Sequence, residues 1–313
     1  MFPAIASDLS KRNLGEPWDI LPIIANCCQY PYYLDAQKLL QKDASRNLSI
    51  LAMCLINGEI LNNNPSGPYT VAGMNVFEYL EKLCLPSFAA PPDRDLTYRK
   101  GCRFHPISLH EAGITTEGYL WELGDIINTR YLWKPSRRAY PIFNHERFSK
   151  EEVDQLARLT KKLGGYRRVP LADGIQRLLS SGNMGENITF ARRHMEAMAK
   201  EVARAVAKGH QLRLGRLCSG CGSQQQTAIF LSNHKWTYRL PEKEHQGYVF
   251  TSSLDNENAN DLHRHVCVEV SWVGSDDNIP QLHTRRGILG LCFFPGHKPR
   301  EVNFPWPSSL LRV

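Results

Sequence analysis

A change in the spacing of apolar residues at Gly209 constrains the fold of this chain most. Before it, the segment Glu186–Lys208 carries apolar residues along one face at helical spacing: Ile188, Ala191, Met195, Met198, Val202 and Ala205. After it come five short apolar segments with turn-like flanks: Leu212–Leu217, Thr227–Leu231, Gly247–Thr251, Arg264–Val273 and Arg285–Phe294. Glycine is a typical residue just past the end of a helix. The pattern predicts an α+β fold in which helices precede an antiparallel sheet.

The fourth apolar segment has the clearest alternation. Its residues Val266, Val268, Val270 and Trp272 alternate with Cys267, Glu269 and Ser271. Successive side chains of a strand point to opposite faces of the sheet. We therefore predict that the valine face is buried and that the face carrying Glu269 is in contact with solvent.

The first part of the chain is predicted to be helix-rich with a few short strands. Apolar residues recur at helical spacing in Leu48–Leu55 and in Val76–Cys84, and we expect these two helices to pack together. Short β segments are expected at Arg103–Phe104, Ile107–Leu109 and Tyr119–Trp121. This pattern predicts a mainly helical unit with short β segments at residues 1–135.

The remainder of the chain, residues 136–313, is predicted to contain helices followed by a β-rich unit. Ser149 and Glu152 have the spacing of a capping box, which marks the start of a helix. The Gly164–Gly165 pair is expected to end that helix. The long helix before Gly209 and the β segments after it complete this second unit.

Composition argues for a protein that works inside the cell. The longest uninterrupted apolar stretch, Ile50–Ile56, is far shorter than the ~20 residues that a membrane span requires. The chain has 9 cysteines, an odd number, mostly within apolar stretches, which favours reduced thiols. We therefore expect a cytoplasmic protein with no membrane span.

The net charge of +7 is concentrated in residues 151–250. A stripe of basic residues on the long helix forms a possible face for an anionic partner: Arg193, Lys200, Arg204 and Lys208. The alternative is a solvated helix face, because Glu196 precedes Lys200 at the favourable i,i+4 spacing. Nucleic acid is not expected as a partner, since the segment from Ala191 to Cys218 has no aromatic side chain on which bases could stack.

One constellation has the residue types of a metal site. Cys218 and Cys221 have the CxxC spacing. Further along the chain, His263, His265 and Cys267 occur at every second position, which places them on one side of a predicted strand. These five residues could bind zinc or form the site of an unrecognised enzyme. The alternative is that the second group simply belongs to a solvent-facing strand, because its spacing is not that of a standard zinc knuckle.

Other catalytic motifs are incomplete. The pairs His110–Glu111 and His145–Glu146 lack the second histidine one turn later that a zinc protease helix needs. The sequence contains neither a phosphate-binding loop ending in Gly-Lys-Ser or Gly-Lys-Thr nor a G-x-S-x-G nucleophile elbow. We therefore expect a non-enzymatic protein with no cofactor.

Eight segments of the chain carry a resemblance to a known family: Ser7–Arg12, Leu21–Cys28, Leu48–Ala52, Leu55–Leu61, Cys102–Phe104, Gly118–Gly124, Tyr248–Thr251 and Leu289–Phe294. They resemble the region that follows the effector domain in fungal heterokaryon incompatibility (HET) proteins. The resemblance implies an accessory or regulatory region of a fungal nonself-recognition protein, linked to programmed cell death after fusion of unlike cells. It also implies protein partners, or an effector domain that we expect this chain to lack.

The resemblance leaves two roles open for such a region. It is either a binding or regulatory module, or a stabilising platform with no activity of its own. A large exposed apolar patch favours an interaction module or a face left bare by another domain.

Overall fold

The fold was analysed in a computed structural model of the chain. The structure describes residues 15–28, 30–59, 62–63, 103–130, 132, 148–165, 169–180, 190–218, 226–231, 247–252, 267–273, 279–294 and 298–307.

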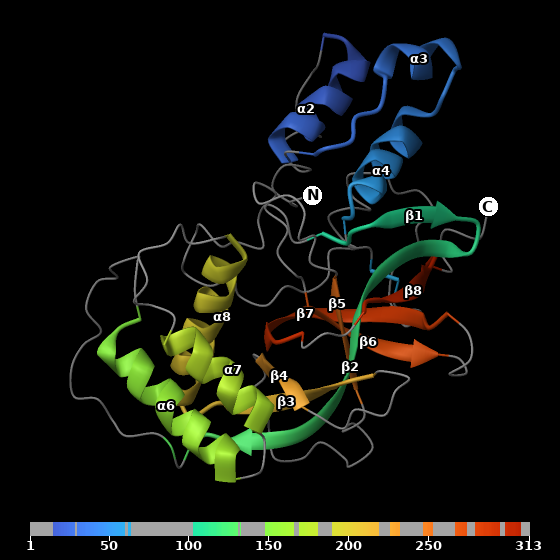
Figure 1. The fold of residues 1–313 in the computed structure, drawn as a ribbon. Coiled ribbons are helices and arrows are strands. Elements are labelled where there is room, and N and C mark those ends of the chain that lie inside the picture. The colour runs from blue at the N-terminus through green and yellow to red at the C-terminus, as the bar shows by residue number, and fades with distance from the viewer. Residues whose placement is uncertain are drawn as a thin grey trace.

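The protein has an α+β fold, as predicted (Figure 1). The helices are η1 (Pro17–Asp19), α2 (Ile20–Cys28), α3 (Ala36–Gln41), α4 (Arg46–Ile56), α6 (Lys150–Gly165), α7 (Val169–Ser180) and α8 (Phe190–Ala207). The strands are β1 (Ile107–His110), β2 (Gly113–Asn128), β3 (Gln211–Leu217), β4 (Gln226–Leu231), β5 (Tyr248–Ser252), β6 (Cys267–Val273), β7 (Gln281–Cys292) and β8 (Arg300–Pro305).

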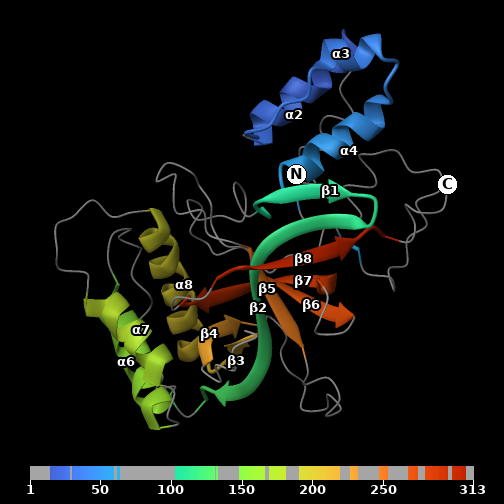
Figure 2. The same cartoon turned by 45° about the vertical axis from the view of Figure 1, so that its right-hand side comes forward.

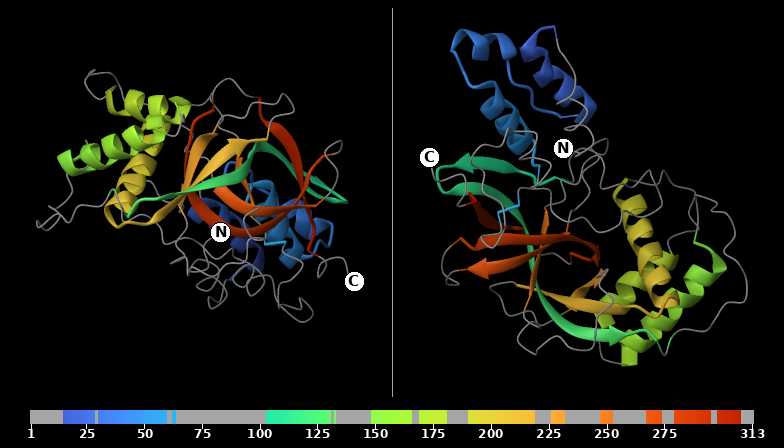
Figure 3. Two further views of the ribbon diagram at one scale, coloured as in Figure 1. Left: turned by 90° about the horizontal axis from the view of Figure 1, so that it is seen from below. Right: turned by 180° about the vertical axis from the view of Figure 1, so that it is seen from behind.

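Six of these strands close into a barrel in the order β2-β3-β4-β7-β6-β5, and β5 pairs back onto β2. All six pairings are antiparallel. The view from below in Figure 3 shows the strands curving around a common interior. The long strand β2 makes closure possible, because its first half pairs with β1 and β8 and its second half pairs with β5 and β3.

The barrel interior contains an apolar cluster with side chains from all six strands. The buried residues are Trp121, Leu123, Leu217, Ala228, Phe230, Val249, Cys267, Ile288 and Cys292. The Trp121 indole packs edge-on against Phe230, with ring centroids 6.1 Å apart, and its Nε1 donates to Thr251 Oγ1 at 2.9 Å. The interior is therefore filled with side chains and is not a pore.

Helices α6, α7 and α8 cover the outer face of β3, β4 and β7 (Figure 1). The capping box is confirmed: Glu152 N–H donates to Ser149 Oγ at 3.1 Å, and Ser149 N–H donates to Glu152 Oε2 at 2.8 Å. Gly209, with a φ of 70°, follows the end of α8 as the spacing predicts. With this face of the barrel, the three helices form the largest apolar cluster among the described residues.

The other outer face of the barrel is covered by β8 and by the end of α4. This cluster contains Leu55, Phe104, Ile114, Leu120, Phe250, Val268, Val270, Leu282, Val302 and Phe304. The Phe104 ring stacks on Phe304 with centroids 4.7 Å apart. Both faces of β6 are therefore buried, one in the barrel interior and one under this cluster.

Helices η1 to α4 form a helical unit that contacts the barrel through the end of α4 and otherwise projects away from it (Figures 1 and 2). It has a small core of its own, built from Ile20, Leu21, Ile24, Ala25, Cys28, Tyr30, Ile50, Met53 and Cys54. Arg103 ties this unit to the barrel, because its guanidinium lies 4.6 Å from the Tyr30 ring and its carbonyl accepts from Ser252 Oγ at 3.2 Å.

One predicted face is wrong. The predicted solvent face of β6 is buried, since Cys267 is 2% and Glu269 9% exposed. These residues lie inside because the barrel closes, and the alternation alone does not show closure. On α4, Leu48 is 64% exposed while Ile50 and Met53 are fully buried, because α4 packs against α2 through the face that carries Ile50 and Met53.

The predicted elements differ from the observed ones in other ways. The Tyr119–Trp121 segment belongs to one long strand, β2, and is not a separate short one. Arg103–Phe104 is not a strand, and the predicted helix Val76–Cys84 lies outside the described residues. The predicted boundary at residue 135 falls between β2 and α6, and the sheet takes strands from both sides of it.

Candidate functional site

The structure describes two of the five residues that the sequence suggested as a metal site. Cys218 follows β3 and packs against the outer cluster that contains Phe250 and Val268. Cys267 lies in the barrel interior, where its Sγ accepts from Thr251 Oγ1 at 3.6 Å. The other three, Cys221, His263 and His265, lie outside the described residues. Within the described ranges, no three histidine, cysteine or acidic residues are grouped to hold a metal.

The Cys218 thiol is not activated by its surroundings. Burial and the nearby Glu122 carboxylate raise its pKa to about 11, although Arg300 and Arg216 lower it in part. A thiol with so high a pKa stays protonated at neutral pH and is a poor nucleophile. Burial likewise raises the pKa of Cys292, next to Cys267.

The basic face of α8 makes several contacts within the protein. Lys200 Nζ lies 5.9 Å from the centroid of the Phe148 ring, and Arg204 forms an ion pair with Glu201. Lys208 is exposed, and the side chain of Arg193 lies outside the described residues. The side chains of Arg204 and Glu201 are only 16% and 15% exposed, so this part of the stripe is occupied by contacts within the protein and is not a fully solvated face. An anionic partner for this face remains a prediction.

A buried group of charges lies inside the barrel, and the sequence analysis missed it. Arg286 Nε donates to Glu269 Oε2 at 2.6 Å, and Arg213 lies close by, where its Nη2 donates to the Leu123 carbonyl at 3.5 Å. Burial lowers the pKa of Arg213, the Glu269 carboxylate raises it, and Arg286 lowers it further. Glu269 therefore compensates positive charge in a low-dielectric interior, which is a structural task.

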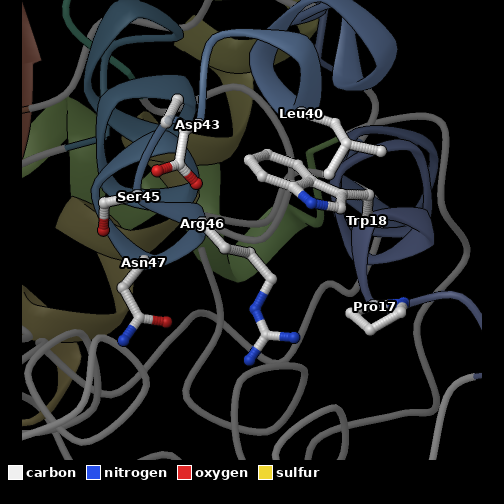
Figure 4. Close-up of a pocket in the computed structure, with 8 residues that line it drawn as sticks. Pro17, Trp18, Leu40, Asp43, Ser45, Arg46 and Asn47 are labelled. Carbon is white, nitrogen blue, oxygen red and sulfur yellow. The ribbon is translucent and has the colours of Figure 1, made fainter.

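A pocket of about 320 Å³ lies on the helical unit (Figure 4). It is lined by Pro17, Trp18, Leu40, Asp43, Ala44, Ser45, Arg46 and Asn47. One wall is apolar and consists of the side chains of Pro17, Trp18 and Leu40, and the facing wall carries the charged groups of Asp43 and Arg46. The sequence analysis did not identify these residues.

Local sequence explains how the pocket forms. Asp35 caps α3 by accepting from the N–H groups of Gln37 and Lys38, both at 3.1 Å. Asp43 then reverses the chain with a φ of 51°, a conformation that aspartate tolerates better than most residues. Ser45 caps α4, because its Oγ accepts from Leu48 N–H at 3.4 Å. This short connection places Asp43 and Arg46 opposite Trp18.

The pocket lies in the part of the molecule with the most exposed apolar side chains. Of the five large apolar side chains that are more than half exposed within the described residues, four lie between residues 32 and 48. They are Tyr32 at 53%, Tyr33 at 58%, Leu40 at 60% and Leu48 at 64%. Leu40 lines the pocket at the start of α4, whereas Tyr32 pairs with Asn57 at the other end of that helix. The helical unit therefore exposes apolar side chains at both ends of α4.

The side chains that line the pocket are accessible to a ligand. The indole of Trp18 is half-buried against the core of the helical unit, which fixes its position. The side chains of Asp43 and Arg46 make no hydrogen bond or ion pair in the described part of the chain. The pocket therefore presents one positive and one negative group beside a rigid apolar wall.

No family model, no curated protein and no solved structure matches this chain. Among the described helices, none has both the length and the apolar character needed to cross a membrane.

Proposed function

We propose that this protein is a non-enzymatic binding module that docks a protein partner through its N-terminal helical unit. The single observation that carries this proposal is the pocket at Trp18, where the 60% exposed side chain of Leu40 continues the apolar wall, on a helical unit that exposes three further large apolar side chains. Apolar surface left in water is unfavourable, and a partner that covers it gains roughly 25 cal/mol per Å².

We further propose that the module is an accessory or regulatory region of the kind that follows the effector domain in HET-type fungal nonself-recognition proteins, and that it acts in the cytoplasm. The resemblance of segments such as Leu21–Cys28 and Gly118–Gly124 supports this assignment. The exposed face of the helical unit is then the surface that contacts the effector domain or another protein.

The chemistry of the thiols supports a non-enzymatic role. Cys218 belongs to the one constellation that the sequence suggested for catalysis or zinc, and its pKa of about 11 leaves it protonated at neutral pH. Cys267 is buried among Thr251 and Cys292 in a packed interior.

Site-specific photocrosslinking tests the proposal. A photoreactive phenylalanine analogue at Leu40 is expected to give a discrete crosslinked species in cells that express the full chain. The matched control is the same analogue at Val273, a residue of similar exposure, 55%, at the end of β6. Equal crosslinking at the two positions, or no crosslinking at Leu40, contradicts the proposal.

A second arm tests the HET assignment. The crosslinked species at Leu40 is identified by mass spectrometry after repeating the experiment with a HET effector domain expressed alongside the chain. A partner that is a HET effector domain or another component of nonself recognition supports the assignment. A reproducible partner of unrelated function leaves the docking role intact and refutes the HET assignment.

A further inference from the structure

The pocket at Trp18 combines three recognition elements within one small concavity. Trp18 and Leu40 offer an apolar surface, Arg46 offers a positive charge, and Asp43 offers a negative charge (Figure 4). None of these side chains is held by an ion pair in the described part of the chain. A ligand therefore does not have to break existing interactions to reach them.

The two charges restrict which partner fits. Docking an apolar side chain against Trp18 and Leu40 removes water from Asp43 and Arg46 as well, because all four line the same pocket. A charge that loses water without gaining an opposite charge weakens binding. A partner with only acidic groups leaves Asp43 uncompensated, and one with only basic groups leaves Arg46 uncompensated.

We propose that the pocket binds a segment of a partner protein in which a large apolar side chain lies between a basic and an acidic residue. The apolar side chain packs against Trp18 and Leu40, the basic residue pairs with Asp43, and the acidic residue pairs with Arg46. This inference rests on the proposed docking function and specifies the chemistry of the partner at one point of that surface.

The indole of Trp18 is held in place before a ligand binds, because it packs against the helical core. The short connection between α3 and α4 fixes the backbone of Asp43 and Ser45, whereas the exposed side chains of Asp43 and Arg46 become ordered when the ligand binds. Preorganised groups lose little conformational entropy when a ligand binds. Tryptophan and arginine are also the residue types that dominate binding energy at protein interfaces.

Fluorescence anisotropy with short synthetic peptides tests the inference on the full chain. Fluorescein-labelled seven-residue peptides carry a central phenylalanine flanked by lysine and glutamate, by two lysines, by two glutamates or by two alanines. We expect the lysine–glutamate peptide, in one of its two orders, to bind about tenfold more tightly than the others. The Trp18→Ala variant is expected to weaken binding of every peptide.

The Arg46→Glu variant gives the sharpest result. Arg46 is exposed at the first position of α4, and glutamate is favourable at a helix start, so the fold is expected to persist. The variant pocket then carries two carboxylates, and its preference is expected to move to the peptide with two lysines. Far-UV circular dichroism and the unfolding midpoint provide the folding control.

The outcomes separate this inference from the proposed function. A peptide preference that Arg46→Glu leaves unchanged, equal binding of all peptides, or no binding at millimolar concentration overturns the inference. If crosslinking at Leu40 persists in those cases, docking through the helical unit stands and only the partner chemistry is wrong. If peptides bind as expected but Leu40 gives no crosslink in cells, the proposed function fails although the pocket binds.

Discussion

The replacement Glu269→Gln tests whether the ion pair inside the barrel stabilises the fold. Glu269 is 9% exposed, and its carboxylate accepts from Arg286 at 2.6 Å near the 6% exposed Arg213. Glutamine keeps the shape of the side chain but removes the charge that compensates both guanidinium groups. Removing one partner of a fully buried ion pair costs roughly 3–5 kcal/mol. Because the Arg286 side chain is 26% exposed, we expect a loss of about 2–3 kcal/mol.

Urea denaturation followed by circular dichroism measures this loss. With a dependence on urea of about 2–3 kcal/mol per molar, the midpoint is expected to fall by about 1 M. The matched control is Glu301→Gln on β8, an exposed carboxylate, for which we expect a change within about 0.5 kcal/mol. A Glu269→Gln variant as stable as wild type refutes the view that the barrel interior depends on this carboxylate.

A double mutant separates the ion pair from other effects of the substitution. The second replacement, Arg286→Gln, removes one of the two charges that Glu269 compensates. Arg286→Gln is expected to lower the free energy of unfolding less in the Glu269→Gln variant than in the wild-type protein, because the ion pair is already broken. Equal costs in the two backgrounds mean that Glu269 and Arg286 do not stabilise each other.

Three further predictions concern packing, ionisation and metal binding. Gly118→Ala places a Cβ 2.3 Å from the Thr251 carbonyl oxygen, and we expect urea denaturation to show a free energy of unfolding lower by about 2–3 kcal/mol. The control Gly287→Ala has open space around the new Cβ and is expected to leave the free energy of unfolding nearly unchanged. The pKa of the Cys218 thiol rises from 9.0 to about 11 on folding, so the thiol of the unfolded chain loses its proton first as the pH rises. The free energy of unfolding of the wild-type protein is therefore expected to fall between pH 9 and pH 11, by about 1–2 kcal/mol more than that of Cys218→Ala. Elemental analysis of purified protein is expected to find zinc well below one equivalent, and stoichiometric zinc that Cys218→Ala abolishes contradicts this.

Local sequence patterns predicted the elements that are held by local interactions. The capping box at Ser149 and Glu152 and the glycine after α8 mark helix ends through contacts within a few residues, and both are confirmed. The strands after Gly209 were predicted within a few residues of their observed positions. The strand β8 was missed, because its Arg300–Pro305 sequence has a proline and only two apolar residues, Val302 and Phe304.

The faces of these elements depend on the whole fold and were predicted less well. Glu269 alternates with valines as a solvent-facing residue does, and only barrel closure and the partner Arg286 explain why it is buried. Leu48 lies on an apolar stripe of α4, yet α2 packs against the opposite stripe. Long-range pairing of this kind leaves no signal in a single local pattern.

The pocket could not be predicted for a related reason. Trp18 and Leu40 have the character of core residues, and Asp43 and Arg46 have the character of ordinary helix-connecting residues. Their convergence requires the packing of η1 against α3, which local spacing does not reveal. The one usable signal was the short segment between two helices, Lys42–Ser45, with an aspartate suited to a positive φ.

Hydrogen–deuterium exchange of the full chain, alone and with the partner identified by crosslinking, shows whether the helical unit is the docking surface. We expect slower exchange in residues 40–48 and around Trp18 when the partner is present, with no change in β3 or β4. Protection confined to the barrel or to α6–α8, with the helical unit exchanging as in the free protein, contradicts this expectation.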